Sequence, residues 1–258
     1  MSLFDFFKRK TSDLPETTNL EDLLKNAASD PSYRVGFYKQ LLLSELIVLT
    51  QDSEFGEGER TLQQDTSLKI LSLDDGRIPV FTSTDRIFDK QQIKEQVHYV
   101  AMKGSDLFAT VRGATLLLNP YSDYGKELLP DEIGKLLDGS IFSSGGRTID
   151  IAKSTEVLLG QPAKIPHELV SALKSAFARK PEVSAAYLGW IDMRGEDEVP
   201  PHYIVGIDSE KYTAELVEEV GFIANQFLGP NELVDIIEVK ENDGVGNYLK
   251  STEPFYRR

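Results

Sequence analysis

The first regular pattern along the chain is helical. Asn19 is a residue type that often caps helix N-termini, and the apolar residues after it recur at the spacing of one helix face: Leu20, Leu23, Leu24, Ala27 and Ala28. Asp30-Pro31 ends this segment, because proline cannot continue a helix, and a second helical pattern follows over residues 37–42. The sequence therefore predicts a helical hairpin after a lead-in of residues 1–18.

Short apolar runs then alternate with amphipathic segments as far as residue 138. The runs are rich in branched residues or bounded by turn residues, and they predict strands over residues 46–50, 69–73, 78–81, 98–102 and 115–118. A helix is expected over 84–96, and the hydroxyls of Thr82, Ser83 and Thr84 before and at its start are expected to cap it. Further helices are expected over 106–112 and from Pro130, a residue tolerated at the first helical position. This mixture predicts a domain in which the helical hairpin packs with a mixed sheet.

A Gly- and Ser-rich stretch at residues 139–146 marks the predicted boundary between two domains, 19–138 and 150–258. The second domain shows strands and helices in the order β-α-β-β-α-β, over residues 156–159, from 166, 183–193, 203–207, 210–227 and 233–239. This order is that of the ferredoxin-like fold. The predicted fold class is therefore α+β (mixed α/β) with two domains.

Composition and charge narrow the classes of function. The 258 residues include 28 Lys and Arg against 42 Asp and Glu, for a net charge of −14. Nucleic acid is not an expected partner, because phosphate contacts need clustered basic side chains. There is no cysteine, which excludes disulfides and cysteine nucleophiles. No apolar stretch is long enough to span a bilayer, so a cytoplasmic protein without stable membrane insertion is expected. Residues 3–10, apolar and then basic, are interpreted as a flexible tail rather than a weak lipid contact.

Motifs for catalysis and for cofactor binding are incomplete. His167-Glu168 begins like a zinc-protease motif, but Ser171 stands where the second histidine is required. Gly125-Lys126 resembles the end of a phosphate loop but lacks both its first glycine and its hydroxyl residue. The three histidines have no partner at ligand spacing, so we expect them at the surface or satisfied by hydrogen bonds. We therefore expect no metal and no cofactor.

The leading candidate for binding is the segment after the predicted strand 115–118, since ligands in α/β folds favour the carboxyl ends of strands. It offers Asn119, Tyr121, Tyr124 and Lys126. Pro120 is expected to hold Asn119 in an extended conformation. Lys126 and the helix N-terminus that follows could together attract a carboxylate. The alternative is an ordinary turn with capping residues.

Two other segments are candidates for binding. The C-terminal residues Phe255, Tyr256 and Arg257 combine aromatic rings with a guanidinium, as interface anchors do. The alternative for them is a tail that docks on its own domain. The first strand-to-helix loop of the second domain begins at Gly160, and small ferredoxin-like modules bind amino acids at that position, which is an analogy of fold alone.

Short pieces of sequence also point to a known family when taken in order along the chain. They are residues 20–28, 34–42, 79–83, 118–120, 125–127, 130–133 and 254–256. Together they resemble the bacterial enhanced serine sensitivity (SseB) family from about residue 19 to the C-terminus. The resemblance implies an SseB N-terminal-like domain over 19–138 and an SseB C-terminal-like domain over 150–258. It also implies a cytoplasmic bacterial protein linked to serine tolerance, and it supplies no catalytic residues.

Two functional hypotheses follow. The first is a non-enzymatic binding or regulatory protein of amino-acid metabolism, whose ligand is an unknown protein partner or a small amino-acid-like molecule. Homo-oligomerisation stays open. The second is an enzyme whose site is assembled from dispersed Asp, Glu, Tyr and Lys residues, which no linear motif would reveal. The lack of a catalytic motif favours the first.

Overall fold

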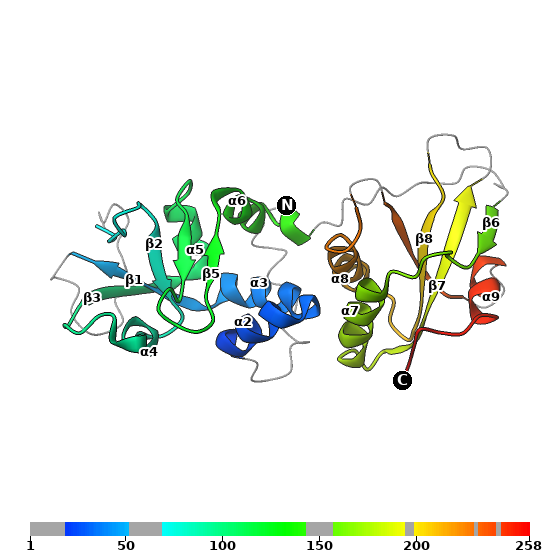
Figure 1. Ribbon diagram of the computed structural model, residues 1–258, viewed down its shortest axis with the longest axis horizontal. Coiled ribbons are helices and arrows are strands. Elements are labelled where there is room, and N and C mark those ends of the chain that lie inside the picture. The colour runs from blue at the N-terminus through cyan, green and yellow to red at the C-terminus, as the bar shows by residue number, and fades with distance from the viewer. Residues whose placement is uncertain (1–18, 52–68, 143–156, 194–198, 230–231, 241–243) are drawn as a thin grey trace. The chain divides into compact units, whose positions relative to one another are not determined.

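The computed structural model describes residues 19–51, 69–142, 157–193, 199–229, 232–240 and 244–258 (Figure 1). The chain forms two compact units, one up to residue 141 and the other from residue 142 onwards, with residues 30–32 grouped with the second. Each unit combines helices with one sheet, so the predicted α+β class with two parts is confirmed.

The predicted helical hairpin is present in the first unit. Helix α2 spans Leu20–Ser29 and helix α3 spans Arg34–Leu43, with a short 3-10 turn between them. The side-chain oxygen of Asn19 accepts the backbone N–H of Glu21 at 3.2 Å, which is a helix cap of the expected kind. The predicted apolar face of α2 is buried through Leu20, Leu23, Leu24 and Ala27.

The sheet of the first unit has the order β3-β1-β2-β4-β5. Its strands are β1 (Glu45–Thr50), β2 (Ile78–Phe81), β3 (His98–Lys103), β4 (Leu116–Leu118) and β5 (Lys126–Leu128). Strands β2 and β4 run parallel and the other pairs are antiparallel, so the predicted mixed sheet is confirmed. Strand β5 forms a hairpin with β4, whereas the sequence placed these residues in a loop. The strand expected over 69–73 is reduced to a single bridge between Thr50 and Ile70.

The helices after the first strands differ in length from those expected. Helix α4 covers only Thr84–Ile87, followed by a 3-10 turn over Asp89–Gln91, so the helix predicted over 84–96 is too long. Lys90 and Gln91 both have φ of 53°, which no continuing helix can accommodate. Helices α5 (Gly104–Thr110) and α6 (Pro130–Asp138) follow, the second with Pro130 in its first turn as predicted.

The elements of the second unit follow the predicted order. Its main elements are β6 (Val157–Gly160), α7 (His167–Ala178), β7 (Val183–Met193), β8 (His202–Ser209), α8 (Ala214–Ala224) and β9 (Val234–Glu238). The strand pairing differs from that of a ferredoxin-like fold. Strands β6 to β9 stand side by side in chain order, and β8 pairs directly with β9 in parallel, whereas the ferredoxin-like fold separates such a parallel pair. The ferredoxin-like arrangement is therefore corrected.

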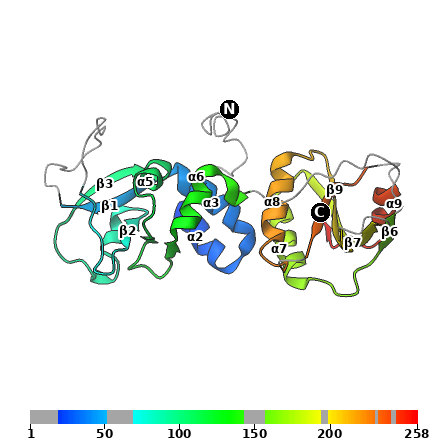
Figure 2. The same ribbon diagram turned by 90° about the horizontal axis from the view of Figure 1, so that it is seen from above.

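Two C-terminal elements that the sequence did not predict complete the second unit. Helix α9 (Gly244–Lys250) lies on the face of the sheet opposite α7 and α8 (Figure 2). Its Leu249 is fully buried over two glycines of neighbouring strands, Gly189 and Gly206. Strand β10 (Tyr256–Arg257) pairs with β7, so the C-terminal segment belongs to the sheet.

One edge of β7 is shared by two short strands. Strand β6 pairs with β7 from Trp190 to Met193, and β10 pairs with it at Ala185 and Ala186. Between them, the side chain of Gln161 donates a hydrogen bond to the carbonyl oxygen of Leu188 at 3.3 Å. Strand β6, the Gln161 side chain and strand β10 therefore each pair with a different part of this edge.

Some predictions lie partly or wholly outside the described residues. The lead-in 1–18, the apolar-basic residues 3–10 and positions 143–146 of the boundary stretch belong to this group. In the part of the chain that the structure describes, no helix has both the length and the apolar composition needed to cross a bilayer.

Candidate functional site

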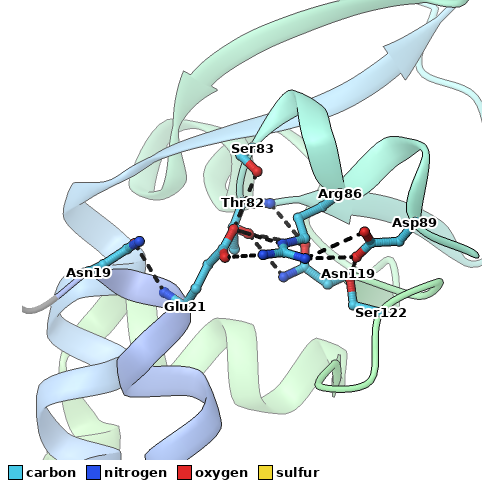
Figure 3. Close-up of polar contacts among 8 residues, drawn as sticks. All are labelled: Asn19, Glu21, Thr82, Ser83, Arg86, Asp89, Asn119 and Ser122. Atoms are coloured by element: carbon cyan, nitrogen blue, oxygen red, sulfur yellow. Dashed lines mark hydrogen bonds and ion pairs between the residues drawn. The ribbon is translucent and has the colours of Figure 1, made fainter.

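The best-developed polar cluster of the first unit lies where the parallel strands β2 and β4 end. Val80 pairs with Leu118, so Thr82 and Asn119 follow the two strands side by side. Ligands in sheets with parallel strands are often bound at this edge. We refer to the residues gathered here and drawn in Figure 3 as the polar network: Asn19, Glu21, Thr82, Ser83, Arg86, Asp89, Asn119 and Ser122.

Asn119 joins the ends of the two strands. It is buried, its backbone N–H donates to the Val80 carbonyl at 2.8 Å, and its side-chain oxygen accepts the N–H of Thr82 at 3.0 Å. Its side-chain nitrogen donates to the Thr82 hydroxyl at 3.0 Å. The predicted extended conformation of Asn119 is wrong, since its φ is 48°. Asparagine tolerates this left-handed region, and here its side-chain bonds hold it there.

Glu21 is the centre of the polar network. Its carboxylate accepts two hydrogen bonds from the Arg86 guanidinium, at 3.0 Å from Nε and at 2.6 Å from Nη2. It also accepts the Thr82 hydroxyl at 2.8 Å. The bonds from Arg86 hold the pKa of Glu21 below its usual value, because they favour the charged form. Arg86 thereby ties α4 to the first turn of α2, as Figure 3 shows.

The hydroxyls after β2 have a different role from the one expected. Thr82 and Ser83 were predicted to cap the following helix, but no side-chain cap bond is formed at the N-terminus of α4. Both hydroxyls instead donate to the carboxylate of Glu21. This difference arises because Glu21 arrives from a helix some sixty residues earlier in the chain, which local pattern does not reveal.

A second set of contacts joins the segment after β2 to the β4–β5 hairpin. Arg86 donates to Asp89 at 3.1 Å, and Ser122 of the hairpin loop donates to the same carboxylate. Lys90 forms an ion pair with Asp123 at 2.7 Å. The hydrogen bond from Ser122, followed by that from Arg86, lowers the pKa of Asp89. We call the two segments, residues 82–91 and 119–125, the loop pair.

The loop pair presents aromatic surface to solvent. Phe88 and Tyr124 are each 45% exposed, and the ammonium of Lys25 lies 5.6 Å from the centre of the Tyr124 ring. All the non-glycine residues with positive φ in the described chain also lie in the loop pair: Lys90, Gln91 and Asn119. Backbone conformations of this kind are concentrated at functional sites, where the surroundings hold them in place.

The side chain of Lys126 is engaged by other residues of the first unit. Its ammonium forms an ion pair with Glu132 of α6 at 2.9 Å and lies 5.7 Å from the centre of the Tyr38 ring. The Tyr38 hydroxyl donates to the same carboxylate at 2.5 Å, and burial together with this bond raises the pKa of Tyr38. The carboxylate that Lys126 was expected to attract is thus already present, and it comes from the first turn of α6.

The four hairpin candidates therefore do not converge on one point. Asn119 belongs to the polar network and Lys126 to the contact with Glu132. Tyr121 packs against Phe81, with ring centres 5.8 Å apart, and Tyr124 stands at the surface. Binding of a ligand by these residues stays a prediction, and Tyr124 is the one that is exposed enough to contact a partner directly.

The candidates in the second unit lie at two places. Gly160 ends β6 opposite Trp190, next to Gln161. Phe255 and Tyr256 pack on Phe177 of α7, with ring centres 6.2 Å and 5.6 Å away, and the Tyr256 hydroxyl donates to the Phe177 carbonyl at 3.1 Å. Of the two alternatives for the C-terminal residues, the structure has the docked tail, and Arg257 remains exposed beside them in β10.

The histidines are placed as expected. His98 and His167 are exposed, and His202 is buried with both ring nitrogens near oxygen atoms. Among the described residues, no group of three or more His, Asp or Glu side chains is arranged to share a metal ion.

Sequence reasoning named one member of the polar network as a site residue and missed the charged ones. Glu21, Arg86 and Asp89 come from a helix start, a short helix and the turn after it, so only the tertiary fold brings them together. The available signal was the pair of hydroxyl residues directly after the predicted strand 78–81.

Comparison with known proteins gives matches over nearly the whole chain. The SseB protein N-terminal domain matches residues 20–135, and the SseB protein C-terminal domain matches residues 151–258. Protein SseB of Escherichia coli strain K12 and Protein SseB of Shigella flexneri are each 29% identical over 254 residues, covering 95% of this chain and 94% of the relative. No solved structure matches.

Proposed function

Since the chain belongs to the SseB family through both of its domains, we propose that it is a non-enzymatic binding or regulatory protein of the bacterial cytoplasm. The proposal places its partner-binding surface on the loop pair, residues 82–91 and 119–125. The link to serine tolerance and amino-acid metabolism comes from the family resemblance, and it supplies the cellular setting of this proposal.

The observation that carries the proposal is the way in which the loop pair is built. The two loops are tied by Asp89–Ser122, a contact between residues 33 positions apart, and by Lys90–Asp123. Arg86 ties them further to α2. The exposed aromatic rings of Phe88 and Tyr124 belong to these two connected loops. Rigid aromatic side chains with little entropy left to lose are typical anchors of protein interfaces.

The charges of the polar network support binding rather than catalysis. Glu21 and Asp89 each accept hydrogen bonds from Arg86 and from a hydroxyl group, which favours their ionised form. A general acid or base needs a pKa near the working pH, whereas the pKa values of both carboxylates are lowered. Because Arg86 is already paired with Glu21 and Asp89, we expect a protein partner on the exposed aromatic surface rather than a free amino acid at these charges.

Site-specific photo-crosslinking in living bacterial cells tests the proposal. A benzophenone amino acid is placed at Phe88 in one variant and at Tyr124 in another, with Leu158 as the matched control, since Leu158 is a large apolar residue that is 51% exposed in the second unit. We expect the same crosslinked protein from positions 88 and 124 and not from 158. Adding Arg86→Ala to either probe variant should weaken that band, because Arg86 no longer holds the loop pair to Glu21 of α2.

A thermal-shift series with each of the twenty amino acids separates the alternatives. A free amino acid that binds the loop pair would raise the melting temperature of the wild type, and the double variant Phe88→Ser, Tyr124→Ser would abolish that rise. The proposal predicts that no amino acid behaves in this way. Such a rise, or crosslinks that are the same at 88, 124 and 158, would overturn a protein-binding loop pair.

A further inference from the structure

His202 is a buried histidine that the proposed function does not use. It is the first residue of β8, and only 3% of its surface is exposed. Its Nδ1 lies 2.7 Å from the carbonyl oxygen of Pro200, and its Nε2 lies 3.0 Å from a carboxylate oxygen of Asp235 in β9. The ring therefore connects three stretches of chain: the residues before β8, β8 itself and the start of β9.

Both neighbours of the ring can only accept hydrogen bonds. A neutral imidazole carries one N–H, so it can donate to the Pro200 carbonyl or to the Asp235 carboxylate, but not to both. The imidazolium carries two N–H groups and satisfies both acceptors at once. The ring is buried, so a ring nitrogen without its proton would face an acceptor oxygen with no donor between them, and the geometry favours the charged form.

The nearest positions of β7 and β8 on this face are apolar, and the cluster on the same face also includes Tyr187 of β7 and Tyr248 of α9. The antiparallel partner of His202 is Ile191 of β7, and the next position on the same face of β8 is Ile204. Lys250 of α9 is directed to Asp208, with an N–O distance of 3.9 Å. Among the described residues, Asp235 is the charged group that acts on the ring, and its hydrogen bond is the main cause that raises the pKa of His202 against the opposing effect of burial.

We propose that His202 is a proton-dependent clasp, which holds the starts of β8 and β9 together only while its imidazole is doubly protonated. On deprotonation, one acceptor loses its donor, and the ion pair with Asp235 becomes a neutral hydrogen bond or is lost. The first residues of β9 then separate from β8 more readily. This inference concerns the second unit and does not depend on the loop pair.

The sign of the pH dependence follows from the raised pKa. The stabilising contribution of the clasp is fully present below the unfolded-state pKa of about 6.5. It is lost as the pH rises through the higher pKa of the folded state. The clasp is thus closed in mildly acidic solution and opens with increasing alkalinity.

Nitrogen-15 NMR of the full-length protein tests the protonation state directly. At about pH 6.5 we expect both ring nitrogens of His202 to show the shifts of an imidazolium, and the titration midpoint to lie above the unfolded-state pKa of about 6.5. In the variant Asp235→Asn the midpoint should fall, since the carboxylate charge is removed. A ring with one protonated nitrogen at that pH, or a midpoint at or below the unfolded-state value, would refute the clasp.

Hydrogen exchange tests the opening. After correction for intrinsic base catalysis, protection of the amides at residues 234–236 should fall between about pH 6 and pH 9, while amides in the middle of the β7–β8 pair should change little. His202→Gln, which keeps a donor but cannot titrate, should remove this pH dependence, and the matched variant His167→Gln should retain it. Equal pH dependence in wild type and His202→Gln would overturn the proposal, even if both proteins are folded.

Discussion

Asn119 carries two tasks at one position. Its backbone adopts a left-handed conformation with φ of 48°, and its side chain binds both the N–H and the hydroxyl of Thr82. The conformation is the kind that glycine adopts without strain, whereas the hydrogen bonds need an amide. No other residue type meets both requirements, and this explains why an asparagine stands there despite the proline that follows.

Substitution at Asn119 separates these tasks. Asn119→Ala should lower the free energy of unfolding by about 2–4 kcal/mol, since it adds left-handed strain and removes the bonds to the part-buried N–H and hydroxyl of Thr82. Asn119→Gly should lower it by about 1 kcal/mol less, because the strain is relieved and only the bonds are lost. Urea unfolding followed by circular dichroism measures both. Equal losses in the two variants would show that the backbone conformation contributes nothing.

Glu21 makes the first unit sensitive to acid. Its pKa is lowered in the folded state by Arg86, so its contribution is present above the unfolded-state pKa and is lost as the pH falls through the lower folded value. Glu21→Gln should therefore reduce the loss of stability between about pH 5 and pH 3, although it lowers stability at pH 7. Unfolding curves at several pH values check this. Glu127→Gln is the control, as Glu127 lies at an exposed position of β5.

At the scale of elements, α9 packs closely on the sheet because the residues beneath it are glycines, which have no side chains. A Cβ atom added at Gly206 would lie 2.6 Å from Leu249 Cδ1 and 2.7 Å from Val239 Cγ2. The corresponding atom at Gly189 would lie 3.0 Å from Leu249 Cδ2. Glycines on two adjacent strands thus form a depression in the sheet, and one leucine fills it.

The fit between Gly206 and Leu249 can be measured with a double-mutant cycle. Gly206→Ala should destabilise by about 1–3 kcal/mol through overpacking, and Leu249→Ala by about 2–5 kcal/mol through loss of buried apolar volume. The double variant should lose less than the sum, because the new methyl group enters the space that the leucine leaves. Additive losses would mean that the two residues do not share this space.

The sequence predicts those elements whose hydrophobic pattern is complete within one continuous segment. The buried face of α2 follows from its apolar spacing, and β7 has the bounds expected from its long apolar run. Strand β5 was missed because Lys126 and Glu127 are charged, and its pairing with β4 depends on the hairpin. The helix after Ser83 was predicted too long, since the sequence does not reveal that Lys90 and Gln91 take positive φ.

In the candidate site, too, local features were predictable and contacts between distant segments were not. Asn119 was found because it follows a recognisable strand, although its conformation was predicted wrongly. Its partners Glu21 and Arg86 were missed, because their proximity depends on how α2 packs beside the end of β2. The strand order of the second unit was missed for the same reason: the sequence gives the succession of elements but not which strands become neighbours.

At the scale of the whole molecule, we predict that residues 150–258 fold on their own. The second unit has its own sheet, helices on both faces and two buried apolar clusters. Expressed alone, this segment should show the circular dichroism of a mixed α and β protein and one cooperative thermal transition. A chain that stays unfolded would place the domain boundary elsewhere.

The divided edge of β7 has a consequence for behaviour at high concentration. A long free edge of a sheet offers a row of unpaired N–H and C=O groups on which a foreign strand can be templated, the first step of many aggregation processes. Here β6 and β10 cover the two ends of that edge, and Gln161 occupies the Leu188 carbonyl between them. Among the residues that the structure describes, the sheet presents on this side a strand of four residues and a strand of two. Strands this short are poor templates for an intermolecular ladder, so we expect this side of the sheet to resist edge-to-edge association.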